Sequence, residues 1–369
     1  MDERRPAALT IGGAMVDTIV VVEPDQIGRL TDDATGQTYL MLEEGRKFVA
    51  SRVTAHVGGG GVNTAVCLQR LGFNVHCVVK LGRDDRSHLV RATLARESIS
   101  DAFVTEHPER ATGASVIVSA HDNNAAILTY RGANSELRAN DLPNATWRPD
   151  LVYIAGLSDA SAELLPKLIN RYAALGSFVA VNPGIRQLRD RIGDLAGAFA
   201  GVNTLFINVD EASVLVQRLM RLQPSMTNAS RHTQSNAGGE LMRRGVTSDG
   251  DRMALPHFFE ALLATGPDCV VVTDGARGAY AATRSEMTFC NAMHVPVAGT
   301  AGAGDAFNAT FAARRWDGDT LEQALRAATV NAASVIGHAD TLSGLLTQQQ
   351  LDAATKTPTP SVETQSWRY

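Results

Sequence analysis

Strand-like and helix-like segments alternate along most of this 369-residue chain. Short apolar runs such as Asn74 to Leu81 predict buried strands, and apolar residues at helical spacing, as in Val62 to Leu71, predict helices. This alternation predicts βαβ units, in which helices cover a mainly parallel sheet. Further strands are expected at residues 7–11, 151–155, 178–181, 205–207 and 269–273, and further helices at 86–96, 161–174, 185–199, 209–219 and 306–315.

Four stretches depart from this rhythm. Residues 17–57 and 103–131 contain short alternating runs, which predict antiparallel strands that project from the main sheet. Open α/β sheets bind ligands at the carboxyl ends of their strands, where such a projection would serve as a lid; a β insertion without a role in binding also fits. Residues 223–251 are polar and glycine-rich and predict a mobile insertion, and residues 355–369 predict a flexible tail.

Composition favours a small diffusible substrate. The formal net charge of −5 gives no reason to expect nucleic acid or an anionic membrane as a partner. The first apolar stretch, residues 7–22, is interrupted by glycine and aspartate, so it predicts neither a membrane span nor a signal peptide. The cysteines show no CxxC pairing and the histidines no ligand spacing, so we expect reduced thiols in a cytoplasmic protein without a structural zinc site.

The segment Gly302-Ala303-Gly304-Asp305 carries the most functional information. It leads into an apolar, helix-forming run, so its amides would face the space before a helix N-terminus, where an anion such as phosphate is favoured. Asp305 stands where a Walker A loop needs lysine, and Phe307 stands where a dinucleotide-binding pattern needs its third glycine. A glycine-rich turn with Asp305 as an ordinary helix-start residue also fits.

Four further motifs follow predicted strands or precede helices. The run Gly58-Gly59-Gly60-Gly61-Val62-Asn63 permits close backbone approach to a ligand, and its asparagine offers a donor and an acceptor to a polyol. Asp17 either accepts hydrogen bonds from vicinal hydroxyls or caps a turn. Asn208 and Glu211 offer oxygen ligands suited to Mg²⁺, or simply begin a helix. Thr273-Asp274-Gly275 would flank a nucleotide or form a plain turn.

Taken in their order along the chain, these motifs resemble those of the PfkB/ribokinase family of carbohydrate and nucleoside kinases. The resemblance covers nearly the whole chain. Gly302-Ala303-Gly304-Asp305, placed after the other motifs, is its most specific part. The resemblance implies one kinase domain over residues 1–369. It also implies a ribokinase-like three-layer α/β/α fold with a central, mostly parallel sheet and a small β-sheet lid, through which the protein would form a homodimer.

The resemblance further implies transfer of the γ-phosphate of ATP to a hydroxyl group. Asp305 would be the catalytic base, and the amides of Ala303, Gly304 and Asp305 would form the anion hole. The acceptor would be held by Asp17, Gly59, Gly60, Asn63 and Arg131. Asn208 and Glu211 would organise Mg²⁺ and its waters, and Thr273, Gly275 and Asn331 would lie near the nucleotide.

The substrate stays open at this point. A neutral sugar is the expected acceptor and a nucleoside is the alternative; a sugar or nucleotide sensor without turnover would use the same fold. An oxidoreductase that binds a dinucleotide is disfavoured because no complete GxGxxG is present. Members of the family often carry a carboxylate in the triplet before Gly-Ala-Gly-Asp. Here the triplet is Gly299-Thr300-Ala301, so no monovalent-cation site is predicted.

Overall fold

A ten-stranded sheet forms the centre of the computed structural model, which describes residues 5–32, 38–119, 125–222, 238–248, 250–356 and 362–368. The strands from β15 to β7 are parallel to their neighbours, and β16, β17 and β18 add an antiparallel edge. The strand order is β18 (Thr364–Arg368), β17 (Glu286–Cys290), β16 (Ala279–Ala282), β15 (Cys269–Thr273), β12 (Thr204–Asn208), β11 (Phe178–Val181), β10 (Leu151–Ile154), β1 (Ala7–Ile11), β6 (Asn74–Leu81) and β7 (Val104–Glu106).

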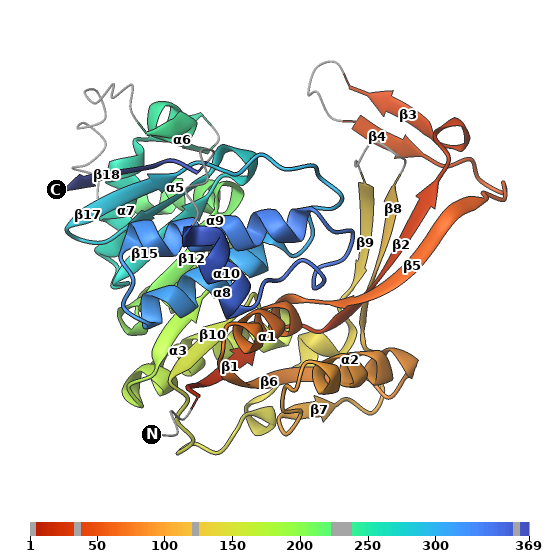
Figure 1. Ribbon diagram of the computed structural model, residues 1–369, viewed down its shortest axis with the longest axis horizontal. Helices are drawn as coiled ribbons and strands as arrows, with labels where there is room; N and C mark the ends of the chain where they lie inside the picture. Colours follow the sequence, from red (N-terminus) through yellow and green to blue (C-terminus); the bar gives the residue numbers. More distant parts are fainter. Residues whose placement is uncertain are drawn as a thin grey trace.

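Helices cover both faces of this sheet (Figure 1). One layer contains α1 (Gly60–Arg70), α2 (Asp85–Arg96), α8 (Ala303–Trp316), α9 (Leu321–Ile336) and α10 (Gln348–Lys356). The other contains α3 (Leu165–Ala174), α4 (Ile185–Ala196), α5 (Val209–Leu222) and α7 (Leu255–Leu263). Successive strand residues such as Ala8 and Leu9 are both fully buried because they point into different helical layers, which explains the continuous apolar runs in the sequence. None of the described helices is long and apolar enough to cross a membrane.

A four-stranded sheet projects from one side of this core and forms the lid (Figure 1). Its strand order is β5 (Ala50–Gly58), β2 (Met15–Val22), β8 (Gly113–Ser119) and β9 (Ala125–Tyr130), and the hairpin of β3 (Gly28–Thr31) and β4 (Thr38–Met41) lies beyond it. The pairing of β2 with β8 is parallel, so the expectation of purely antiparallel strands is wrong there. At the base of the lid, the Asn134 side chain accepts a hydrogen bond from the Ala14 amide and donates one to the Ala14 carbonyl, both at 2.9 Å.

The predicted boundaries of the irregular segments need correction. Residues 104–106 form β7 of the main sheet, so the second lid segment begins at Gly113 rather than at residue 103. Residues 223–237 and 249 of the predicted insertion lie outside the described residues. The rest contains α6 (Gly239–Arg244) and the strands β13 (Val246–Ser248) and β14 (Asp251–Met253), which form a hairpin that ends just beyond the predicted insertion.

The predicted flexible tail is wrong for residues 364–368. They form β18, which pairs antiparallel with β17, and the hydroxyl oxygens of Thr288 and Ser366 lie 2.9 Å apart across this pair. Trp367 is partly buried against the core cluster on the α3, α5 and α7 side, which favours this edge strand. Residues 357–361 and 369 lie outside the described part of the chain.

Candidate active site

The N-terminus of α8 is built to leave amides unpaired. Gly302 occupies the N-cap position with a φ of 79°, and no side chain caps this end of the helix. A side chain at Gly302 would be strained by that φ, and its Cβ would lie 2.7 Å from Thr341 Cβ. The amides of Ala303, Gly304 and Asp305 therefore have no partner within the helix, and together with the helix dipole they favour an anion.

Asp305 lies in the first turn of α8 and is held by a hydrogen-bonded chain of side chains. Asn63 Nδ2 donates to Asp305 Oδ2 at 2.8 Å, and Thr341 Oγ1 donates to Asn63 Oδ1 at 2.9 Å. The second bond fixes the orientation of the Asn63 amide, so its NH₂ group faces the carboxylate. Burial raises the pKa of Asp305, and the Asn63 hydrogen bond partly offsets this rise. The site thus holds an oriented carboxylate that is more basic than an exposed one.

The glycine run brings α1 close to the first strand. Gly59 is the N-cap of α1 with a φ of 96°, and a Cβ there would lie 2.6 Å from the Gly13 carbonyl oxygen. A Cβ at Gly60 would lie 2.8 Å from Ala155 Cβ and 3.6 Å from Asp305 Oδ1. Only glycine allows this approach, which places the start of α1 and its Asn63 directly beside the carboxylate.

Asp17 lies on β2 at the junction of lid and core. Ser115 Oγ on β8 donates to Asp17 Oδ1 at 2.5 Å. Burial raises the pKa of Asp17, while the Ser115 hydrogen bond and the nearby His56 lower it. A Cβ at Gly58 would lie 2.6 Å from Asp17 Oδ2, so the first glycine of the run also leaves room for this carboxylate.

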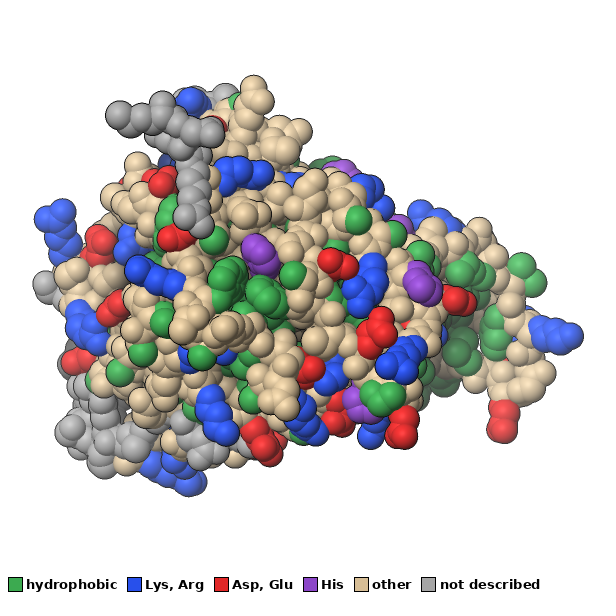
Figure 2. Space-filling model, turned by 90° about the horizontal axis from the view of Figure 1, so that it is seen from below, with side chains coloured by type: hydrophobic (Ala, Val, Ile, Leu, Met, Phe, Trp, Pro, Cys, Tyr) green, Lys and Arg blue, Asp and Glu red, His purple; other side chains and the backbone are tan. Residues whose placement is uncertain are grey.

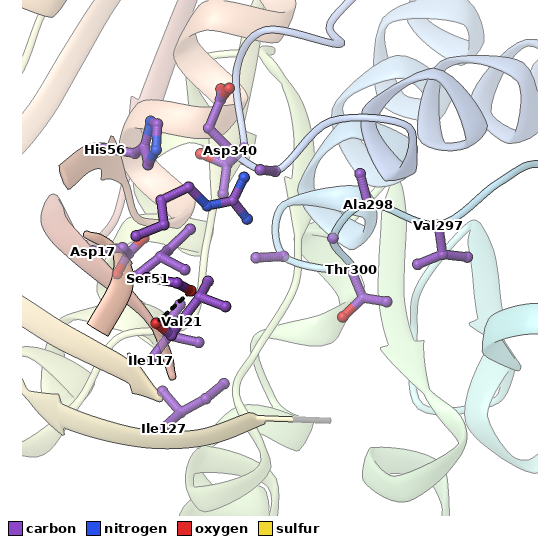
Figure 3. A pocket seen from close by; sticks show the side chains of 16 residues that line it. Asp17, Val21, Ser51, His56, Ile117, Ile127, Val297, Ala298, Thr300 and Asp340 are labelled. Atoms are coloured by element: carbon purple, nitrogen blue, oxygen red, sulfur yellow. Dashed lines mark hydrogen bonds between the residues drawn. The ribbon is translucent and has the colours of Figure 1, made fainter. Parts of the chain in front are cut away.

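A cavity of about 510 Å³ lies between the lid and the loop that precedes α8. Figure 3 shows Asp17, Val21, Ile117 and Ile127 on the lid side and Thr300 with Ala298 on the opposite side. Its size is that of a small-molecule site. Asp17, predicted to hold the acceptor, lines this cavity, whereas Arg131 is exposed and is not part of its wall.

A second cavity of about 160 Å³ lies at the start of α8, where Ala303, Gly304 and Phe307 line it. Thr273 and Gly275, which the sequence predicted to lie near the nucleotide, both line this cavity. Asn331 does not line it. Its side chain is fully buried, donates to Thr310 Oγ1 at 2.8 Å and accepts from the Leu346 amide at 3.0 Å, so it holds α8, α9 and the following loop together. The α9 residues that line this cavity are Thr329, Ala332, Ala333 and Ile336.

Asn208 and Glu211 form a reciprocal pair at the start of α5. Asn208 N donates to Glu211 Oε2 at 2.9 Å, and Glu211 N donates to Asn208 Oδ1 at 2.8 Å. Burial raises the pKa of Glu211 to about 7, partly offset by hydrogen bonds from the Asn208 backbone and the Asn182 side chain. No group of three or more His, Cys, Asp or Glu side chains gathers as a metal site within the described residues. A single carboxylate fits Mg²⁺ only where waters and substrate phosphates complete its shell.

The raised pKa of Glu211 predicts an unusual dependence of stability on pH. The folded state holds a proton that the unfolded state has already released, so the free energy of unfolding should fall as pH rises from about 4.5 to about 7. Without Mg²⁺, the contribution of this group is roughly 3 kcal/mol. Urea titrations across this range should show the fall in the parent protein and a flatter profile in Glu211→Gln. The control Glu322→Gln, at an exposed position in the first turn of α9, should keep the parent profile; equal slopes in all three would contradict the prediction.

Sequence reasoning missed Thr341 and His56. Thr341 orients Asn63 and packs against Gly302, and His56 lies in the wall of the larger cavity beside Asp17. Thr341 follows α9 in a stretch without any motif, and His56 is one of several polar residues that alternate with apolar residues along β5. No local pattern distinguishes either residue, because their roles depend on contacts between distant segments.

Comparison with known proteins agrees with this geometry. The chain is similar to the ribokinase of Staphylococcus aureus (strain COL), with 24% identity over 280 residues that cover 76% of this chain and 78% of the relative. Among solved structures it is similar to a nucleoside kinase of Methanocaldococcus jannaschii, with a TM-score of 0.71, 19% identity and coverage of 96% and 99% of the two chains. It is also similar to Arabidopsis thaliana ribokinase complexed with ribose and ATP, with a TM-score of 0.70, 18% identity and the same coverage.

The fold and these matches define a sugar or nucleoside kinase, a phosphotransferase with an alcohol group as acceptor. The model of the pfkB family carbohydrate kinases matches residues 26–348, and the chain belongs to this family. The expected family and the expected ribokinase-like fold are thereby confirmed.

Proposed function

We propose that this protein transfers the γ-phosphate of ATP to a hydroxyl of a small sugar, with Asp305 as the catalytic base. The observation that carries the proposal is the carboxylate of Asp305 in the first turn of α8, beside the uncapped amides of this helix and held by Asn63. Ala301, just before this helix, lines the larger cavity, and Ala303 and Gly304, its first residues, line the smaller one. The related Arabidopsis structure contains ribose and ATP, which supports the same pair of substrate classes here.

In the proposed reaction, the acceptor binds at Asp17 and the nucleotide at Thr273 and Gly275. The acceptor oxygen forms a bond to the γ-phosphorus while the bond from that phosphorus to the β,γ-bridging oxygen breaks, and ADP leaves. Asp305 takes the hydroxyl proton, and its raised pKa favours this transfer. The amides of residues 303–305 stabilise charge that develops on the transferred phosphoryl group. Bound at Glu211 through water, Mg²⁺ would neutralise charge on the nucleotide phosphates.

The direct test is a screen for ATP consumption with a panel of sugars and nucleosides, with the phosphorylated product identified by mass spectrometry. We expect one acceptor class to give a product whose mass is increased by one phosphoryl group. If these ligands raise the apparent stability of the protein against unfolding but none of them gives a product, the protein would instead be a sensor.

The lid also offers a surface for a second copy of the chain. Val53, Val116, Leu128 and Tyr130 are exposed on lid strands, and Figure 2 shows hydrophobic side chains on the protruding lid. In the register of the sheet, Val116 pairs with Leu128 and with Thr18, so these residues face away from the cavity that Asp17 and Ile19 line. We propose that the protein forms a homodimer through this face of the lid. Light scattering at micromolar concentration measures the mass, and a value equal to the monomer mass of 39.3 kDa would contradict the proposal.

A further inference from the structure

The start of α6 is fixed on the antiparallel edge of the main sheet (Figure 1). The chain enters this helix through Gly238 and Gly239, with φ of 103° and 73°. A Cβ at Gly238 would lie 2.6 Å from Trp367 Cη2, and one at Gly239 would lie 2.4 Å from Tyr280 Oη. The Tyr280 hydroxyl also donates to the Gly238 carbonyl at 2.8 Å. Only glycine lets the backbone pass so close to these rings.

The end of α6 is fixed as well. Arg252 on β14 donates from Nε to the Arg244 carbonyl at 2.6 Å and from Nη2 to the Arg243 carbonyl at 2.7 Å. The last carbonyls of a helix have no partner within it, and this guanidinium supplies one. The backbone that carries the Arg244 side chain therefore has a defined position.

The Arg244 side chain reaches the turn between β15 and β16. Its Nη2 donates to both carboxylate oxygens of Asp274, at 3.0 and 3.2 Å. Arg277, within the turn, donates to the same carboxylate from Nε at 2.9 Å and from Nη2 at 2.5 Å. The Asp274 side chain is only 1% exposed. A carboxylate buried to this extent is costly without hydrogen-bonded partners, so the two arginines hold it in place.

The same turn forms one wall of the smaller cavity. Thr273, directly before Asp274, and Gly275, directly after it, both line this cavity. The Asp274 amide donates to the Gly278 carbonyl at 2.8 Å and closes the turn, and Gly278 is a lining residue too. The Asp274 carboxylate thus connects α6 to the wall at which the nucleotide is proposed to bind.

This connection acts across the sheet. Ala279 lines the smaller cavity, whereas its neighbour Tyr280 bonds to Gly238, so the cavity and the start of α6 lie on opposite faces of β16. We propose that α6 sets the affinity for the nucleotide indirectly, with Arg244 and Asp274 as positioning residues for the turn that lines the smaller cavity. This inference rests on the proposed kinase function and deepens it. It gives a role to part of the segment that the sequence predicts only as a mobile insertion.

Loss of the Arg244 side chain should leave the turn less well defined. In Arg244→Gln, Asp274 keeps its bonds to Arg277, which belongs to the turn itself, but its ionic link to α6 is lost. The turn then adopts the binding orientation for only part of the time, and the apparent affinity for nucleotide falls in proportion to that fraction. Because Arg277 still pairs with the buried carboxylate, the variant should fold.

Calorimetric titration with ADP measures this effect without any acceptor. Arg244→Gln should raise the Kd for ADP about 2- to 30-fold, the usual range for residues that act on a site without contacting its ligand. The KM for ATP, measured with the acceptor that gives most product in the ATP-consumption screen, should rise by a similar factor. The kcat should stay within about twofold, because Asp305 and the amides of α8 are unchanged. Thermal unfolding checks that the variant is folded.

Arg243→Gln is the matched control. Arg243 is the neighbouring residue on α6 and is exposed, and the bonds that the structure describes at the Asp274 carboxylate come from Arg244 and Arg277 instead. This variant should keep the parent Kd for ADP. Arg244→Lys should recover part of the lost affinity, because Arg244 contacts Asp274 through a single nitrogen that an ammonium group can replace.

A double-mutant cycle tests whether Arg244 acts through Asp274. Asp274→Asn should also raise the Kd for ADP. Combined with Arg244→Gln, it should raise the Kd by less than the product of the two single effects, since both substitutions weaken one contact.

Equal Kd values for ADP in the parent protein and in folded Arg244→Gln would overturn the inference and leave the kinase function intact. A lower Tm with an unchanged Kd would do the same, by assigning Arg244 a structural role alone. An equal rise of Kd in Arg243→Gln would assign the effect to the net charge of α6 and would also overturn the inference. If the parent protein binds no ADP, the nucleotide site itself is contradicted, and with it the proposed kinase function.

Discussion

Replacing Asp305 by Asn is expected to lower the rate of phosphoryl transfer roughly 10²–10⁴-fold, the usual contribution of a general base. The amide has the shape of the carboxylate and its oxygen still accepts the hydrogen bond from Asn63, so the site should keep its geometry. Binding of ATP should change little, because the amides of α8 and the residues Thr273 and Gly275 remain in place. Steady-state kcat and calorimetric titration with an ATP analogue measure the two effects separately.

Asp85 provides the control for this substitution. It also lies in the first turn of a helix, α2, but is exposed and lies outside both cavities. Asp85→Asn should retain the parent kcat.

In the parent protein, activity should fall as pH drops through the raised pKa of Asp305, because the protonated carboxyl no longer accepts the hydroxyl proton. Near-normal turnover by the Asp305→Asn variant would remove Asp305 from the role of base.

The second large effect is expected from Gly304→Pro. Gly304 is the second residue of α8, where proline is tolerated because the backbone N–H has no partner within the helix. Apart from its chain neighbours and the nearby backbone of α8, no heavy atom lies within 4 Å of where its Cβ would be, so the Cβ side of the ring has room. The substitution removes one anion-binding donor and puts a ring carbon in its place, so kcat should fall roughly 10²–10³-fold.

Gly304→Ala separates loss of the donor from added bulk. It keeps the amide and adds a Cβ in open space, so the kcat of this variant should stay within about threefold of the parent value. Because alanine has a higher helix propensity than glycine, the free energy of unfolding of the variant should be at least that of the parent protein. Thermal unfolding of both variants checks that α8 is still formed. If alanine and proline lower kcat equally with both proteins folded, the Gly304 amide does not stabilise the transferred group.

Much of the core could be predicted from the sequence because parallel strands covered on both faces are continuous apolar runs. The expected strands at 7–11, 74–81, 178–181 and 269–273 coincide with β1, β6, β11 and β15. Glycine runs before helices also mark their positions reliably, since α1 and α8 begin within them. These features depend on residues close together in the chain.

Features that depend on distant contacts were not predictable in this way. The alternating pattern of β2 and β8 predicts strands but carries no information on the direction of pairing, which is parallel. Asn331 lies on the helix that borders the smaller cavity, yet its side chain faces Thr310 in the core, a matter of helix rotation that a motif does not define. Thr341 is tied to Asn63 across a sequence separation of 278 residues.

The attachment of the lid through Ala14 and Asn134 has a consequence for the evolution of substrate range. One wall of the larger cavity belongs to the lid sheet and the other to the loop before α8, and the pair of hydrogen bonds at Asn134 lies where the lid leaves the core. The width of the larger cavity between Ile127 and Thr300 therefore depends on the angle between the lid and the core as well as on the side chains that line it. Substitutions at this joint would retune the size of the molecule that fits while every contact within each wall is conserved.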